Sequence, residues 1–166
     1  MIKLCRGKVQ KIFLAILCIL SFAKFSEATD EKKWILQVDI GKAAFPGSEY
    51  DGSYFSFRAS KSLKLDNSLM SSIGIMGGSA PNNTTYKIFA AEIKYRFRTN
   101  KKISPFIGAG GGILSVGDYA GLIFTGAFGI DINIQQRYII PIAWSFGIGG
   151  YGSGPSIISV GFGCRF

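Results

Sequence analysis

The feature that most constrains this chain is the segment Phe89–Arg98, in which residue character alternates strictly. Its odd-numbered positions carry Phe, Ala, Ile, Tyr and Phe, and its even-numbered positions carry Ala, Glu, Lys, Arg and Arg. A helix would scatter those charges around its axis, whereas a strand places all of them on one side. The segment therefore predicts a β-strand with one apolar face and one charged face.

Further segments of the same kind bring the expected number of strands to eight. They are Trp34–Ile40, Tyr54–Arg58, Leu69–Met76, Ile103–Ser115, Leu122–Ile134, Ile140–Phe146 and Ser156–Phe166. Ile103–Ser115 is rich in Gly, so its register stays open. An even strand number places both chain ends on one side of a barrel, the periplasmic side in bacterial barrels.

Polar segments rich in Gly, Pro, Asn, Asp and Ser separate the strands. Those expected on the outer side are Lys42–Gly52, Gly77–Thr85, Val116–Gly121 and Gly149–Pro155. The others are Lys61–Ser68, Thr99–Lys102 and Gln135–Arg137. The two groups occur alternately along the chain, as an up-and-down topology requires.

The distribution of large side chains between the two faces of the strands predicts which face contacts lipid. The apolar face carries Phe, Ile, Leu, Tyr and Trp, while the other carries small residues and charges. Eight strands enclose a space barely wide enough for side chains, so the bulky face must point outward. We therefore predict an all-β fold, a closed antiparallel up-and-down eight-stranded transmembrane β-barrel. A soluble barrel that carries a ligand is the competing fold.

The first 28 residues have the three-part pattern of a secretory signal peptide. Basic residues up to Lys11 precede an apolar run at Ile12–Ala23, and small residues follow at Ser26 and Ala28. The run is short for a transmembrane helix, which needs about 20 residues. We predict a signal peptide at 1–28, cleaved after Ala28, and a barrel at 29–166, with an uncleaved amino-terminal anchor as the alternative.

The residue inventory limits the chemistry that this chain can perform. The sequence contains no His, and Cys164 is its only Cys beyond the leader. Catalysis by His and the commonest zinc ligand are thereby excluded. We expect no catalytic residue, no metal site and no cofactor. The net charge of +9 suits anionic partners, but no basic helix or nucleic-acid motif is visible, so we expect no nucleic-acid partner.

The charges on the inward faces are the main candidate site. We interpret them as a salt-bridge network inside a narrow barrel, with a gated ion path or an acid–base pair as alternatives. Asp39 is expected near the outer end, and most of the bases near the periplasmic end. The predicted network comprises Asp39, Arg58, Glu92, Lys94, Arg96, Arg98, Asp131 and Arg165. Aromatics expected at the membrane interfaces, rather than as ordinary strand residues, are Trp34, Tyr138, Trp144 and Tyr151.

Three stretches, Phe89–Phe97, Ser104–Gly112 and Gly161–Phe166, resemble the small outer-membrane barrel superfamily of OmpA-type, OmpX-type and opacity-type proteins. The resemblance implies that the outer-membrane assembly machinery reads the last strand, with Phe162 and Phe166 as its signal. It also implies a location in the bacterial outer membrane, in contact with lipid and lipopolysaccharide. Enzymes of this architecture that deacylate or palmitoylate lipid A rely on His, which this chain lacks.

We therefore expect a non-enzymatic outer-membrane barrel of the cell envelope in a Gram-negative bacterium. Its role is expected to be structural or one of surface interaction, with a salt-bridged and largely filled interior, and the oligomeric state is expected to be monomeric. The alternative is a narrow, porin-like channel for ions or small solutes. Short connectors on the presumed outer side argue against an adhesin.

Overall fold

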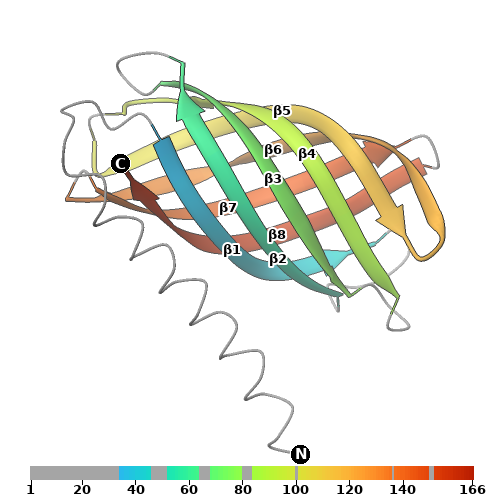
Figure 1. The fold of residues 1–166 in the computed structure, drawn as a ribbon. Coiled ribbons are helices and arrows are strands. Elements are labelled where there is room, and N and C mark those ends of the chain that lie inside the picture. The colour runs from blue at the N-terminus through green and yellow to red at the C-terminus, as the bar shows by residue number, and fades with distance from the viewer. Residues whose placement is uncertain are drawn as a thin grey trace, which may run out of the picture.

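The computed structural model describes residues 34–45, 52–63, 68–79, 84–99, 101–135, 137–149 and 152–166. These residues form eight strands, and each strand pairs antiparallel with the next. β1 also pairs with β8, which closes the sheet into a barrel (Figure 1). The strands are β1 (Trp34–Ala44), β2 (Gly52–Ser62), β3 (Leu69–Ser79), β4 (Thr85–Arg96), β5 (Ile103–Val116), β6 (Tyr119–Ile134), β7 (Tyr138–Gly149) and β8 (Gly152–Arg165). The predicted fold class and strand number are confirmed.

The two chain segments that close the barrel meet at their ends. The backbone N–H of Trp34 donates to the carbonyl of Phe166 at 3.0 Å, and the N–H of Phe166 donates to the carbonyl of Trp34 at 3.0 Å. From there β1 and β8 pair in register up to Ala44 and Ser156. We call the end that holds Trp34 and Phe166 the turn end, and the opposite end the loop end.

The connection between β5 and β6 differs from the prediction. Val116 pairs directly with Tyr119, so a two-residue turn, Gly117 and Asp118, replaces the predicted connector Val116–Gly121. Gly117 has a φ of 57°, and a glycine with positive φ in the first position is what a type II′ hairpin turn requires. The polar composition of this segment indicated a turn correctly, but the strands on either side continue further than expected.

The register of the Gly-rich strand β5 places its glycines opposite the charges of β4. Glu92 pairs with Gly110, and Lys94 pairs with Gly108, so both glycines belong to the inward face. A Cβ atom on Gly110 would lie 2.2 Å from the carbonyl oxygen of Ala91. The close approach of the two strands at this point therefore requires glycine.

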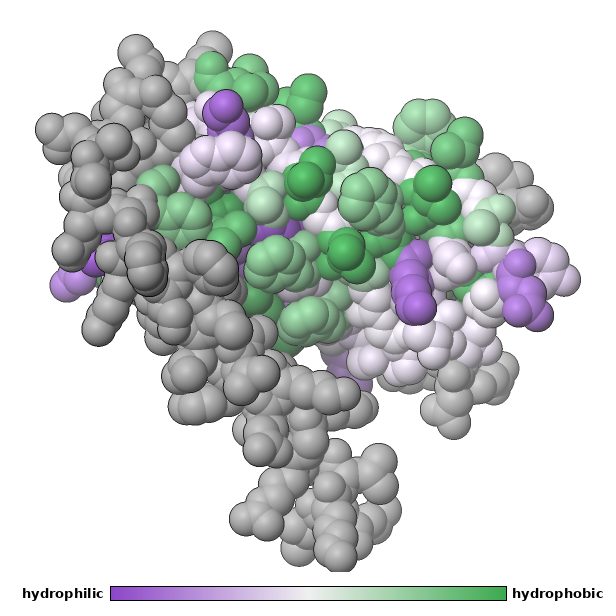
Figure 2. All heavy atoms as spheres, in the orientation of Figure 1, coloured by the Kyte–Doolittle hydropathy of each residue, from purple (hydrophilic) through white to green (hydrophobic). Residues whose placement is uncertain are grey.

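The outward and inward faces of β3 and β4 differ sharply in exposure. On β3 and β4, Ile75 and Phe89 are 61% and 55% exposed, whereas the inward Ile88 is 2% exposed. On the face drawn in Figure 2, hydrophobic side chains cover the middle of the barrel. No helix among the described residues is long and apolar enough to span a membrane. The expected alternation, with bulky apolar residues outside, is confirmed.

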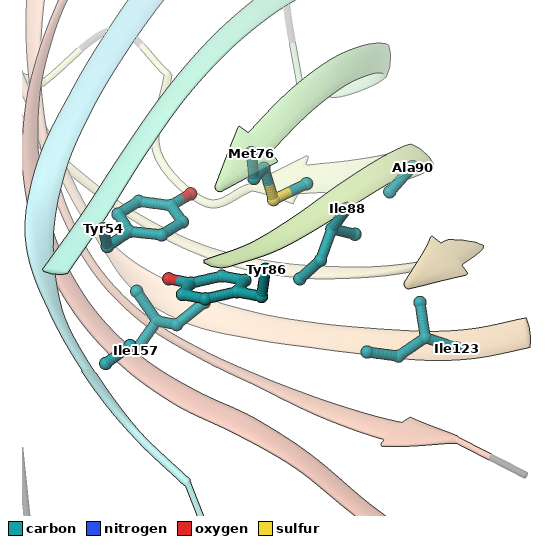
Figure 3. Packing of buried hydrophobic residues seen from close by; sticks show 8 residues of the cluster. Tyr54, Met76, Tyr86, Ile88, Ala90, Ile123 and Ile157 are labelled. Carbon is teal, nitrogen blue, oxygen red and sulfur yellow. The ribbon is translucent and has the colours of Figure 1, made fainter. Parts of the chain in front are cut away.

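The interior contains large apolar side chains as well as the small and charged residues that we expected. A buried group near the loop end, the loop-end cluster, consists of Ala43, Tyr54, Met76, Tyr86, Ile88, Ala90, Ile123 and Ile157. Figure 3 shows these side chains turned toward one another from opposite walls of the barrel. A smaller buried group near the turn end, the turn-end cluster, consists of Ile35, Met70 and Ile139.

Candidate functional site

Between the two apolar clusters lies a layer of ionised side chains, which we call the charged layer. All of its members stand on the inward faces of β1, β2, β4 and β6, because strand alternation directs every second residue into the barrel. Its members are Asp39, Arg58, Glu92, Lys94, Arg96 and Asp131. It holds three acids and three bases, so its formal charge is balanced.

Arg58 on β2 forms the centre of the first half of the layer. Its Nη1 lies 2.9 Å from Oε2 of Glu92, and its Nε lies 3.6 Å from Oδ2 of Asp39. Its Nη2 donates to the hydroxyl of Tyr54 at 3.0 Å. One guanidinium thus joins β1, β2 and β4 and links the charged layer to the loop-end cluster.

Neutral groups complete the hydrogen bonding of both acids around Arg58. The Gln37 carboxamide donates to Oδ1 of Asp39 at 2.7 Å, and the Ser56 hydroxyl donates to Oδ2 at 2.6 Å. The Thr125 hydroxyl donates to Oε1 of Glu92 at 3.0 Å. Buried carboxylates need such donors because water no longer solvates them.

Asp131 on β6 forms the centre of the second half. Its side chain is fully buried, and it accepts a hydrogen bond from Nζ of Lys94 at 2.8 Å. Nε of Arg96 lies 2.6 Å from its other oxygen. The ammonium of Lys94 also lies 3.6 Å from the centre of the Phe106 ring. Asp131 therefore neutralises two bases of β4 across β5.

The structure shows a small cavity at the charged layer. This cavity of about 30 Å³ lies beside Arg58, Glu92 and Lys94, with Ser159 and Phe106 also on its wall. A space of this size holds about one or two water molecules. With each acid paired to a base, the arrangement is suited to hold the strands together.

The predicted network is brought together only in part: Arg98 falls outside the charged layer, and Arg165 lies at its turn-end side, where it interacts electrostatically with Arg96 and Asp131. β4 ends at Arg96, and Arg98 lies exposed in the following turn with a φ of 56°. That left-handed conformation takes its side chain out of the strand alternation. Arg165 donates to the carboxamide oxygen of Asn133 near the turn end. Asp39 lies in mid-strand beside Arg58, not near the outer end as expected.

The aromatic residues singled out from the sequence lie at different heights. Trp34 and Tyr138 stand at the turn end, where the Tyr138 and Phe162 rings stack with their centres 5.5 Å apart. Phe166 belongs to the seam with Trp34. Trp144 lies near the middle of β7. Tyr151 lies outside the described residues.

Sequence reasoning missed the loop-end cluster and the neutral donors of the charged layer. Tyr86 and Ile88 precede the point at which we expected their strand to begin. Gln37 and Ser56 lay within expected strands and on the inward face, so their position next to Asp39 was readable from strand alternation. Their partners were not, because these depend on the stagger between strands.

Comparisons with known proteins show the fold. No protein-family model matches the chain, and no curated protein sequence matches it. Among solved structures, Neisserial surface protein A (NspA) matches with a TM-score of 0.66 and 14% identity, over 80% of this chain and 97% of that one. The amino-terminal β-barrel domain of Pseudomonas aeruginosa OprF matches with a TM-score of 0.61 and 11% identity, over 80% and 97%.

The outer membrane enzyme PagL also matches, with a TM-score of 0.53 and 18% identity, over 80% of this chain and 99% of that one. At such low identities the likeness concerns the fold alone. This chain has the eight-stranded barrel fold of these small outer-membrane proteins, as the resemblance of its sequence implied.

Proposed function

We propose that this chain is a bacterial outer-membrane β-barrel with a closed interior and a non-enzymatic, structural or surface-interaction role. The observation that carries the proposal is the charged layer, which is fully ion-paired and lies between two apolar clusters. A continuous water path through the barrel would have to displace both the apolar side chains and the ion pairs.

The membrane location rests on the outward surface and on the fold. Apolar side chains such as Ile73, Phe89 and Ile107, each more than half exposed, would be costly in water. Lipid around a closed barrel accommodates them and leaves no backbone group without a partner. The likeness to NspA and OprF supports the same location. Export by the leader, with cleavage after Ala28, is part of this proposal.

The non-enzymatic role rests on the residues that the interior contains. PagL is an enzyme, so the barrel fold by itself admits catalysis. A Ser–His–acid mechanism needs His, and this sequence has none. Each acid of the charged layer lies inside the barrel and against a base; these acids are Asp39, Glu92 and Asp131. This supports a structural use of the acids over acid–base chemistry.

The test is electrophoresis before and after boiling, followed by conductance in planar bilayers. We expect a shift in apparent mass on boiling, as for a folded membrane barrel, and no steady openings in the bilayer. Steady openings that change in size in a Glu92→Gln variant, but not in the outward-facing Lys42→Gln variant, would establish the narrow channel instead. A protein that stays in solution without detergent would overturn the membrane location.

A further inference from the structure

The turn end of the barrel carries a ring of bases, which we call the basic rim. Lys61 is the last residue but one of β2, Arg98, Lys101 and Lys102 lie in the connection from β4 to β5, and Arg137 lies in the turn from β6 to β7. The first four side chains are exposed, and Arg137 is half-buried. The bases come from one strand end and two separate connections, so they are distributed around the barrel.

Lys61, Arg98, Lys101 and Lys102 form no ion pair with an acid in the described part of the chain. Asp39, Glu92 and Asp131 belong to the charged layer inside, and Asp118 lies in the turn at the loop end. The stretches 29–33 and 64–67, outside the described residues, carry equal numbers of acids and bases. The loop end, in contrast, presents the acid Asp118 together with exposed lysines on β1 and β4. The excess positive charge is therefore concentrated at one end.

Two of these bases lie over aromatic rings at the border of the apolar surface. Nζ of Lys61 lies 5.5 Å from the centre of the Trp34 ring, and the guanidinium of Arg137 lies 6.0 Å from that of Tyr138. Trp34 is 46% exposed. Aromatic rings with cationic side chains above them are typical of the level where lipid headgroups meet acyl chains.

Apolar residues also lie directly beside the bases of the β4–β5 connection. Phe97 is 42% exposed next to Arg98, and Ile103 is 52% exposed next to Lys102. The bases of the rim thus favour a partner that carries negative charge. The same partner would also contact apolar side chains one or two residues away. A phospholipid with an anionic headgroup meets both with one molecule, whereas a polar anionic polymer would leave the apolar residues exposed to water.

We propose that the basic rim binds anionic phospholipid headgroups, such as phosphatidylglycerol, in the leaflet that surrounds the turn end. This inference rests on the proposed function, because it requires the barrel to span a bilayer. The apolar surface would set the height of the barrel in the membrane, and the bases would select headgroup charge at that height.

The two Trp residues of the chain allow a direct test with the protein purified from membranes of expressing cells. Trp34 stands at the basic rim, and Trp144 stands near the middle of β7. In vesicles of phosphatidylcholine and phosphatidylglycerol, brominated acyl chains on one or the other lipid quench nearby Trp fluorescence. In a Trp144→Phe variant, the remaining Trp34 reports quenching at the basic rim alone. In a Trp34→Phe variant, the remaining Trp144 reports quenching near the middle of the barrel.

We expect brominated phosphatidylglycerol to associate with the Trp34 site about threefold or more better than brominated phosphatidylcholine. Trp144 should show no headgroup preference. In the Trp144→Phe background, Lys61→Gln with Lys101→Gln should abolish the preference at Trp34. The matched pair at the loop end, Lys42→Gln with Lys87→Gln, should leave it unchanged.

Each contrary result has a defined meaning. Equal quenching of Trp34 by the two lipids, or a preference that survives Lys61→Gln with Lys101→Gln, overturns the inference and leaves the membrane barrel intact. Loss of the preference in the Lys42→Gln and Lys87→Gln pair also overturns it. Failure of both lipids to quench either Trp would overturn the proposed function itself.

Discussion

The loop-end cluster and the charged layer fill the same narrow interior with opposite chemistry. Tyr86 and Ile123 in the cluster are almost fully buried, and so is Asp131 in the charged layer. Burying an apolar side chain stabilises the fold by about 1.5–3 kcal/mol. A buried ion pair gains little net free energy, because the loss of hydration offsets the attraction between the charges.

The difference indicates a division of roles within the interior. The loop-end cluster supplies stability, while the charged layer specifies which strands meet and in which register. Arg58 connects β1, β2 and β4, and Asp131 connects β4 with β6. A slip of one residue in β4 would turn Glu92 and Lys94 toward lipid. Four sets of substitutions can test this division through the free energy of unfolding in lipid vesicles.

The largest effect is expected from Asp131→Ala, which removes the acid between two bases. Lys94 and Arg96 would remain inside the barrel without their counter-charge. We expect a loss of about 3–5 kcal/mol, measured by denaturant unfolding of the inserted protein. Asn133→Ala at the turn end serves as the control and should cost much less. An equal loss in both variants would contradict the role assigned to Asp131.

Ile123→Ala is expected to have the next largest effect. Ile123 is 1% exposed in the loop-end cluster, so the substitution leaves a cavity and costs about 2–4 kcal/mol. Ile113→Ala is its matched control, because Ile113 is 52% exposed on the outward face. The outward variant should lose about 1 kcal/mol or less, since lipid fills the space. Similar losses for both would show that the cluster is not a stabilising core.

Gly110→Ala tests the contact between β5 and the charges of β4. The new Cβ would lie 2.2 Å from the Ala91 carbonyl oxygen and 2.6 Å from Cγ of Glu92. We expect a loss of about 1–3 kcal/mol from the forced separation of the strands. At the outward neighbour, Gly111→Ala, the nearest atom lies 3.4 Å away, and the free energy of unfolding should hardly change. A greater loss for Gly111→Ala would refute this account of β5.

The smallest effect is expected when the second half of the charged layer is replaced as a whole. Lys94→Met with Arg96→Met and Asp131→Leu removes the three charges together, so neither base of β4 is left without its acid. We expect the free energy of unfolding to stay within about 1 kcal/mol of the original or to rise. A loss as large as that of Asp131→Ala would show that the ion pairs themselves supply stability.

The strands and their faces were predictable from the sequence, because residue alternation with period two is a local property. Phe89–Arg98 established the inward position of Glu92, Lys94 and Arg96 without any knowledge of neighbours. The ends of the strands were harder to predict from the sequence, since the chain can continue in strand conformation through polar residues. That is why Tyr86 and Ile88, and with them the loop-end cluster, were missed, and why Arg98 was placed inside.

Contacts across the barrel were beyond the sequence for a different reason. Whether Arg58 meets Asp39 depends on the register between β1 and β2, and whether Asp131 meets Lys94 depends on the stagger of β4 and β6 across β5. Alternation leaves that stagger undetermined. The structure also gives the reason for small inward residues in β5, because Gly108 and Gly110 lie opposite Lys94 and Glu92.

The seam between Trp34 and Phe166 has a consequence for the order in which the barrel forms. The β5–β6 hairpin needs only the two residues Gly117 and Asp118 to reverse the chain, so its strands can pair within microseconds. The pairing of β1 with β8 joins the two ends of the described chain, and such non-local contacts form slowly. We expect the seam to be the last pairing to form. Until then, both edge strands would offer open hydrogen-bonding groups to any machinery that guides insertion.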